Sequence, residues 1–247
     1  MRPWFTVSES GWDRFCLEWE EKELASMSNG LSAYLGDAAV KQALATGAMH
    51  TALAGVISAF AFPVTLIAAS DIIDNSWSVI CQRVDKVAEV LCTLIVGCRG
   101  YARRPLSLIG FGLGARIIFR TLERLFKCGC VGAVEHVVIA GAPVTGGRGA
   151  WEKVRTVASG RCINVYSRQD WVLGMLHREN ILSSGAAGLL PVCEGPERAP
   201  LGAGVVENLD ATQFEITTQS DYASKMKNVL EHMGLSMRGF RRVQLMS

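Results

Sequence analysis

The segment Gly110-Phe-Gly-Leu-Gly114 has the spacing of a nucleophile elbow, the turn between a strand and a helix that presents a catalytic serine. An elbow reads G-x-S-x-G, and here Gly112 stands at the position of the serine. A serine at that point is held at a positive φ that costs about 1–3 kcal/mol, whereas glycine adopts this conformation freely. We therefore interpret the turn as an elbow that has lost its nucleophile, and acyl transfer as the chemistry lost with it.

The residues on both sides of this turn fit a strand and a helix. Pro105 to Ile109 is short and apolar, as a buried strand requires, and Ala115 to Phe126 repeats apolar residues at helical spacing. We therefore expect the elbow to span residues 105–126. The same glycines, with Ala115, also satisfy the G-x-G-x-x-G/A fingerprint for dinucleotide phosphates. We disfavour this alternative and expect no cofactor, because no carboxylate follows about 20 residues later to hold a ribose.

A carboxylate stands where the acid of a catalytic triad would follow a strand. Asp170 comes soon after the predicted strand Ile163 to Tyr166, where it could orient an imidazole. Alternatively, Asp170 caps a helix that begins near Trp171, and the residues leave both interpretations open. None of the four histidines follows the last predicted strand at a turn, so we interpret each as structural. They are His50, His136, His177 and His232.

Eight segments spread over nearly the whole chain carry a resemblance to a known family. These segments are Glu18–Leu24, Ile73–Trp77, Arg104–Arg116, Gly141–Val144, Val157–Arg161, Arg168–Trp171, Ala187–Pro191 and Val206–Asp210. Through them the chain is similar to the α/β-hydrolase-like domain of the transmembrane and coiled-coil domain-containing protein 4 family, known as domain of unknown function 726. The resemblance implies an α/β fold with a mostly parallel sheet flanked by helices, of which the N-terminal part is expected to be absent here.

The resemblance also implies which positions correspond to a catalytic triad. The family's elbow reads Gly-Phe-Ser-Leu-Gly-Ala-Arg, so its serine corresponds to Gly112 and its acid to Asp170. Its histidine, which precedes an Asp-Tyr pair, falls near Gln219. Two of the three members are thus replaced, which implies that no catalytic residue set is intact and that these positions are vestigial.

A turn without a nucleophile still begins a helix, and helix N-termini attract negative charge. The backbone N–H of Leu113 and the adjoining Gly114 would lie at this N-terminus. We therefore predict a candidate binding site for a small anion there.

Composition excludes several classes of protein. At 247 residues and a formal charge of +2, the chain suits a single domain spanning residues 1–247, and no basic surface indicates nucleic-acid binding. Eight scattered cysteines favour an intracellular, reducing compartment. Their spacing matches no zinc site, so we expect no metal.

A long uncharged stretch raises the question of a membrane. Residues 42–70 contain no Asp, Glu, Lys or Arg, and about 20 apolar residues suffice to cross a bilayer. We favour a buried helix over residues 43–70, because Pro63 would kink or end a helix and the stretch is rich in alanine. A membrane span over residues 51–69 remains the alternative.

Periodicity places the other elements. We expect an early strand or the end of a strand over 15–20, a helix over 20–35, and a helix over 77–96 capped by Asp74-Asn-Ser76. Strands are expected over 134–140, 162–166 and 205–209, with helices over 148–158 and 219–233. The Gly- and Pro-containing segment 185–204 should run irregularly near the carboxyl ends of the strands.

Together these features favour a catalytically degenerate domain that acts as a binding or scaffolding module, with a protein partner, within a larger assembly or at a membrane. The first alternative is a serine hydrolase of lipid or acyl esters whose nucleophile was lost or mutated. The second is a membrane-spanning protein that uses residues 51–69.

Overall fold

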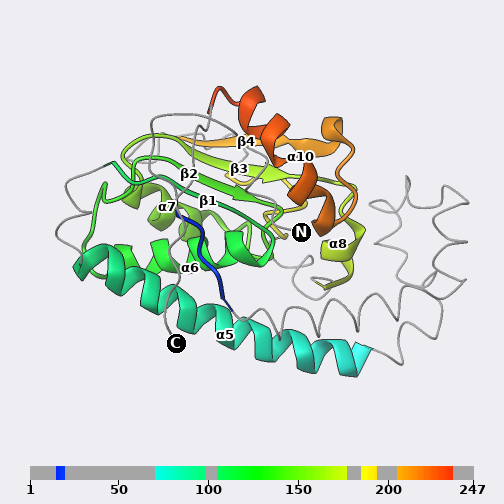
Figure 1. Cartoon of the computed structure of the whole chain (residues 1–247), viewed down its shortest axis with the longest axis horizontal. Coiled ribbons are helices and arrows are strands. Elements are labelled where there is room, and N and C mark those ends of the chain that lie inside the picture. Colours follow the sequence, from blue (N-terminus) through cyan, green and yellow to red (C-terminus); the bar gives the residue numbers. More distant parts are fainter. Residues whose placement is uncertain (1–14, 20–69, 98–104, 177–184, 194–204, 236–247) are drawn as a thin grey trace, which may run out of the picture.

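A four-stranded parallel sheet forms the centre of the molecule. The computed structural model describes residues 15–19, 70–97, 105–176, 185–193 and 205–235. Its strands lie in the order in which they occur along the chain (Figure 1): β1 (Leu108–Phe111), β2 (Val137–Ala140), β3 (Cys162–Tyr166) and β4 (Val206–Asp210). Every pairing is parallel. The expected α/β fold is therefore confirmed.

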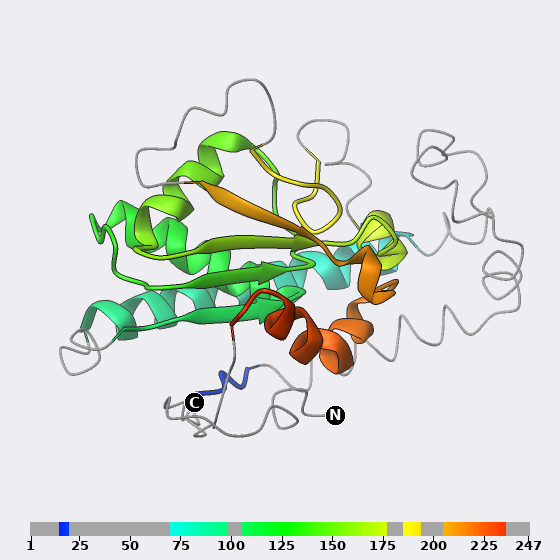
Figure 2. The same cartoon turned by 90° about the horizontal axis from the view of Figure 1, so that it is seen from above.

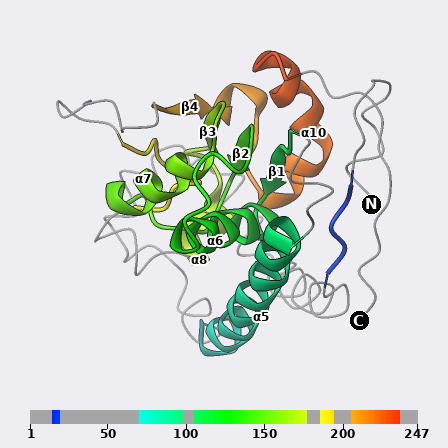
Figure 3. The same cartoon turned by 90° about the vertical axis from the view of Figure 1, so that its left-hand side faces the viewer.

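Helices cover both faces of the sheet. α6 (Leu113–Lys127) and α7 (Arg148–Val157) connect successive strands on one face, and α5 (Ser70–Gly97) lies along the outer side of α6. α10 (Gln219–His232) covers the opposite face, so the strands separate it from α6 and α7 (Figure 3). Two short elements follow β3 and β4: α8 (Trp171–Leu176) and the 3₁₀ helix η2 (Ala211–Phe214) (Figure 2).

Alternate residues of the central strands face the two helical layers. Val137 and Ile139 of β2 belong to the core beneath α6 and α7, which includes Trp151. Val138 and Ala140 face α10, as part of the second core. Every residue of β2 and β3 is buried, as expected for parallel strands covered on both faces. This burial explains why these strands read as continuous apolar runs.

Two predicted strands begin later than expected, each for its own reason. Val134 forms only an isolated bridge with Ala158, directly after α7, so β2 begins at Val137 instead. β1 begins at Leu108 and not at Pro105, since Pro has no N–H to contribute to a strand ladder. Near the N-terminus, the structure describes residues 15–19 of the segment expected to form a strand. Only Leu17 forms a bridge there, so the prediction was wrong for these residues.

The predicted cap of α5 was also wrong. The described part of the helix spans Ser70–Gly97 and runs through Asp74-Asn-Ser76. Asp, Asn and Ser inside a helix cost less than about 1 kcal/mol each relative to Ala, so a cluster of capping residues does not by itself end one. The expected helices over 20–35 and 43–70, and the span over 51–69, lie outside the described residues apart from Ser70. Among the described helices, none combines the length and hydrophobicity needed to cross a bilayer.

Candidate active site

Gly112 follows β1 directly and has the backbone conformation of an elbow. Its φ is 55° and its ψ is −126°, and its N–H donates to the carbonyl oxygen of Ala140 at 2.9 Å. Gly110 is required for a different reason: a Cβ there would lie 2.8 Å from the carbonyl carbon of Gly114 and 2.9 Å from the nitrogen of Ala115. The strand and the helix thus approach too closely for a side chain at 110. A Cβ at Gly114 would meet open space.

Asp170 lies after β3, only 1% exposed, and its two oxygens have separate partners. Oδ1 accepts a hydrogen bond from the N–H of Leu173 at 3.0 Å, so Asp170 caps the start of α8. Oδ2 accepts one from the side-chain amide of Gln219 at 2.5 Å. The two interpretations of Asp170 left open by the sequence are therefore compatible, because one carboxylate both caps α8 and faces the first residue of α10.

Gln219 brings the three predicted positions together. Besides Asp170, its Nε2 donates to the carbonyl oxygen of Gly141 at 3.1 Å, so both amide hydrogens are used. Its Oε1 lies against Gly112, where an added Cβ would collide with it. We call this arrangement the Gly112–Gln219–Asp170 cluster. The amide of Gln219 thus occupies the space into which a side chain at 112 would project.

Burial dominates the electrostatics of this cluster. It raises the pKa of Asp170 to about 7, although the hydrogen bonds from Leu173 and Gln219 act in the opposite direction. A buried carboxylate is usually stabilised by a cation. Gln219 offers Asp170 a neutral amide instead, which supports the carboxylate through a hydrogen bond and adds no positive charge.

Tyr222, one helical turn after Gln219, belongs to the same region. Its ring is buried, stacks on Phe111 with centroids 6.3 Å apart, and packs so closely on Gly141 that a Cβ there would clash. Within the described part of the chain, its hydroxyl has no hydrogen-bond partner. Burial, and then the charge of Asp170, raise its pKa well above the ordinary value. Sequence reasoning did not select this residue, although its spacing from Gln219 places both on one side of a helix.

The start of α10 is held by a capping box that positions Gln219. Asp221 Oδ2 accepts hydrogen bonds from the backbone N–H groups of Thr217 and Thr218, at 2.9 and 2.8 Å. The Thr218 side chain in turn caps the N–H of the third helical residue. The orientation of the first turn, and with it the side chain of Gln219, therefore depends on Asp221.

Leu113 and Gly114 are the first residues of α6, as predicted. No hydrogen bond joins the N–H of Leu113 to another described residue. The anion site stays a prediction.

The histidines that the structure describes lie away from Gly112. His136 precedes β2, at the end of the sheet opposite the elbow, and its Nδ1 accepts from the N–H of Arg161 at 3.0 Å. His232 ends α10, about 20 Å of helix from Gln219, and packs edge-on against Phe214. His50 and His177 lie outside the described residues. Among the residues the structure describes, no group of His, Cys, Asp and Glu side chains is arranged to hold a metal ion.

A strand–elbow–helix unit, sequential parallel strands and an acid after β3 together define an α/β-hydrolase-like domain. Residues 1–236 match the family described as protein of unknown function (DUF726), and the chain belongs to this family.

Several proteins of known sequence are similar to the chain. The transmembrane and coiled-coil domain-containing protein STS1 of rice (Oryza sativa subsp. japonica) is 38% identical over 241 residues, which cover 95% of this chain and 34% of that protein. An uncharacterized membrane protein of Caenorhabditis elegans is 34% identical over 226 residues, covering 91% of this chain and 35% of that protein.

A probable lipase of Saccharomyces cerevisiae, MIL1, is 29% identical over 238 residues, covering 95% of this chain and 21% of that protein. The chain therefore spans between about a fifth and about a third of the length of these relatives. No solved structure matches the chain.

Proposed function

We propose that this chain is a catalytically inactive α/β-hydrolase-like domain that acts as a binding or scaffolding module. The observation that carries the proposal is the position of the Gln219 amide, which bonds to Asp170 and to Gly141 and fills the space beside Gly112. Glycine has no group that a neighbouring base could activate. Loss of a triad nucleophile removes about six orders of magnitude of rate.

The two replacements support each other physically. Gly112 lacks the Cβ that would collide with Gln219, and Gln219 donates a hydrogen bond to the buried carboxylate of Asp170. A reversal at either position alone would disturb the other. This mutual fit favours a cluster maintained for structure over one in which a single catalytic residue has changed by chance.

The names of relatives favour a membrane setting for this module. The rice and C. elegans relatives are named as transmembrane and membrane proteins, respectively. We propose that the domain serves within a larger assembly at a membrane, where a protein partner contacts it. Extraction of membranes with alkaline carbonate separates the alternatives, because a chain that spans the bilayer through residues 51–69 stays in the pellet.

A second candidate function is hydrolysis of lipid or acyl esters, favoured by the name of the yeast relative and by the elbow conformation kept at Gly112. In this proposal the chain retains the frame of a hydrolase whose nucleophile and base were replaced. The double variant Gly112→Ser/Gln219→His would then place a hydroxyl, an imidazole and Asp170 in sequence. Either single variant would leave the set incomplete.

Activity-based labelling with a fluorophosphonate probe tests the proposal. The unmodified chain should stay unlabelled, as should Gly112→Ser and Gln219→His alone. Labelling of the double variant that disappears when Asp170→Ala is added would support an intact frame around a lost nucleophile. Labelling of the unmodified chain that disappears with Asp170→Ala would overturn the proposed inactivity.

A further inference from the structure

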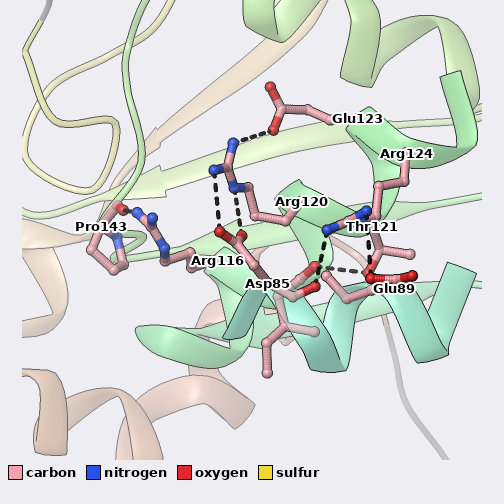
Figure 4. Close-up of polar contacts among 10 residues, drawn as sticks. Asp85, Glu89, Arg116, Arg120, Thr121, Glu123, Arg124 and Pro143 are labelled. Atoms are coloured by element: carbon pink, nitrogen blue, oxygen red, sulfur yellow. Dashed lines mark hydrogen bonds and ion pairs between the residues drawn. The ribbon is translucent and has the colours of Figure 1, made fainter. Parts of the chain in front are cut away.

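Helices α5, α6 and α7 all end at the end of the molecule where the strands begin. α6 and α7 each run back from the end of one strand to the start of the next. α5 runs in the same direction as α6: Arg120 Nε donates to Asp85 Oδ1 at 2.8 Å. One turn further along both helices, Arg124 pairs with Glu89 at 3.9 Å (Figure 4). This end lies on the left in Figure 1.

α10 reaches the same end on the other face of the sheet. Arg161, which directly precedes β3, donates from Nη1 to the carbonyl oxygen of Met233, the C-cap of α10, at 2.6 Å. The described chain therefore stops at this end after Gly97 of α5 and, beyond α10, after Leu235. It resumes there at Val205, directly before β4.

Large apolar side chains are exposed at this end. Of the seven exposed large hydrophobic residues in the described part of the chain, four lie here, and we call them the end patch. They are Leu94 and Val96 in the last turn of α5, Val131 after α6 and Val205 before β4, with 36, 51, 68 and 62% of each residue exposed. Single exposed apolar residues are ordinary, but their concentration on one part of a surface marks an interaction site.

The charge near the end patch is positive. Residues 90–97 and 126–134 contain no carboxylate, and Lys127 among them is exposed. Glu207, near the start of β4, is held by Arg161 through two hydrogen bonds, at 2.9 and 2.7 Å. The sequence that follows Gly97, residues 98–104, contains three arginines, and the sequence that follows Leu235, residues 236–247, contains three more. Neither segment contains a carboxylate, so both favour a negatively charged partner.

We propose that the end patch docks on the surface of a membrane that contains anionic lipids. This inference rests on the membrane setting proposed above and names the surface that contacts the bilayer. Apolar side chains that enter the headgroup region and basic side chains that attract anionic lipids contribute together to such binding. A bilayer surface is broad and deformable, so it can receive side chains from α5, from the loop after α6 and from the start of β4 at once. A protein partner would need a matching recess for each.

Flotation of the full chain with lipid vesicles tests the proposal. We expect binding to vesicles of phosphatidylcholine mixed with phosphatidylserine, little binding to phosphatidylcholine alone, and weaker binding as salt is added. Val96→Asp and Val131→Asp should each lower the apparent affinity by about tenfold, because a charged side chain cannot replace a buried valine. Val79→Asp is the matched control. Val79 is also exposed on α5, at 45%, but lies about 25 Å of helix away from Val96.

Two results would overturn the end patch as the docking surface. One is equal binding to vesicles with and without phosphatidylserine. The other is equal binding by all three variants, since insertion of the uncharged residues 42–70 would require neither Val96 nor Val131. All three positions are exposed, so the Tm of each variant should match that of the unmodified chain.

Fractionation of cells that express the full chain distinguishes failure of this inference from failure of the proposed function. An unmodified chain found only in the soluble fraction would contradict the membrane setting itself. A Val96→Asp/Val131→Asp double variant that stays with the membranes as fully as the unmodified chain would contradict only the end patch. We expect the unmodified chain and Val79→Asp in the membrane fraction, and a larger soluble share of the double variant.

Discussion

Gly112 and Gln219 act as one unit at the scale of single residues. The backbone at 112 has a φ of 55°, which L-residues rarely adopt, and the Gln219 amide lies where a side chain at 112 would project. Any residue other than glycine at position 112 would therefore destabilise the fold in two ways. Its backbone would be strained, and its side chain would collide with the Gln219 amide, which is already bonded to Asp170 and Gly141.

Gly112→Ala should therefore destabilise the protein. Backbone strain alone should lower the free energy of unfolding by about 1–3 kcal/mol, and displacement of the Gln219 amide adds to this loss. Urea unfolding measures the change. Gly114→Ala, two residues on, is the matched control: its Cβ meets open space inside a helix, so stability should hold or rise by up to about 1 kcal/mol. Equal losses in the two variants would contradict this account.

Asp170 should make stability depend on pH. Its pKa is about 7 in the folded protein, above the ordinary value of 3.8, so between these pH values the folded state binds more protons than the unfolded state. The free energy of unfolding contributed by Asp170 therefore falls as pH rises from about 4 to about 7, and is constant above.

Comparison with Asp170→Asn isolates this contribution, because the amide oxygen can still accept from Leu173 and carries no charge. Glu207, whose pKa is lowered first by its hydrogen bond from Arg161, contributes with the opposite sign in both proteins. We expect the stability difference between the two proteins, followed by urea unfolding, to change across this pH range. A constant difference would show that Asp170 ionises in the folded protein as it does in the unfolded chain.

At the scale of secondary-structure elements, sequence periodicity predicted those helix and strand bounds that depend on residues near one another in the sequence. The strand over 162–166 was confirmed with the same bounds, and α7 and α10 differ from their predicted ranges by a single residue at one end. Periodicity did not predict where β2 begins, because this start depends on a pairing partner. Val134 pairs only with Ala158, and the pattern along the chain does not reveal that bridge. Likewise, spacing and resemblance selected Gly112, Asp170 and Gln219, but the bond from Gln219 to Gly141 depends on how α10 crosses the sheet.

The first turn of α10 should control the cluster. Asp221→Ala removes the acceptor for the N–H groups of Thr217 and Thr218, and loss of such a cap costs about 1 kcal/mol. We expect a lower free energy of unfolding and faster amide hydrogen exchange at the start of α10. Asn228→Ala, on the exposed side of the same helix, should change stability by less than about 0.5 kcal/mol. A loss as large in Asn228→Ala would mean that helix propensity, and not the cap, is responsible.

At the scale of the whole molecule, polar side chains of the sheet hold segments that lie far apart in the sequence. Asn208 on β4 bonds to both backbone groups of Val192: its Oδ1 accepts from the N–H at 2.9 Å and its Nδ2 donates to the carbonyl oxygen at 2.9 Å. Asn164 on the adjacent strand also donates to Asn208 Oδ1, at 3.2 Å. This pair fastens the Val192 end of segment 185–193 to the sheet, whereas backbone hydrogen bonds from Ala187 and Gly188 hold its other end.

Asn208→Ala should loosen the Val192 end of that segment. Val192 is buried, so its N–H and carbonyl groups would lose their partners, at a cost of about 1–3 kcal/mol for each group left unsatisfied. We expect a lower free energy of unfolding and faster exchange of the Val192 amide, while the amides of β2, two strands away, keep their protection relative to global unfolding. Asn208→Asp is the matched control, because a carboxylate still accepts from the Val192 N–H but cannot donate to its carbonyl group. If the Val192 amide exchanged equally fast in both variants, the hydrogen bond to its N–H would not be what holds this end of the segment in place.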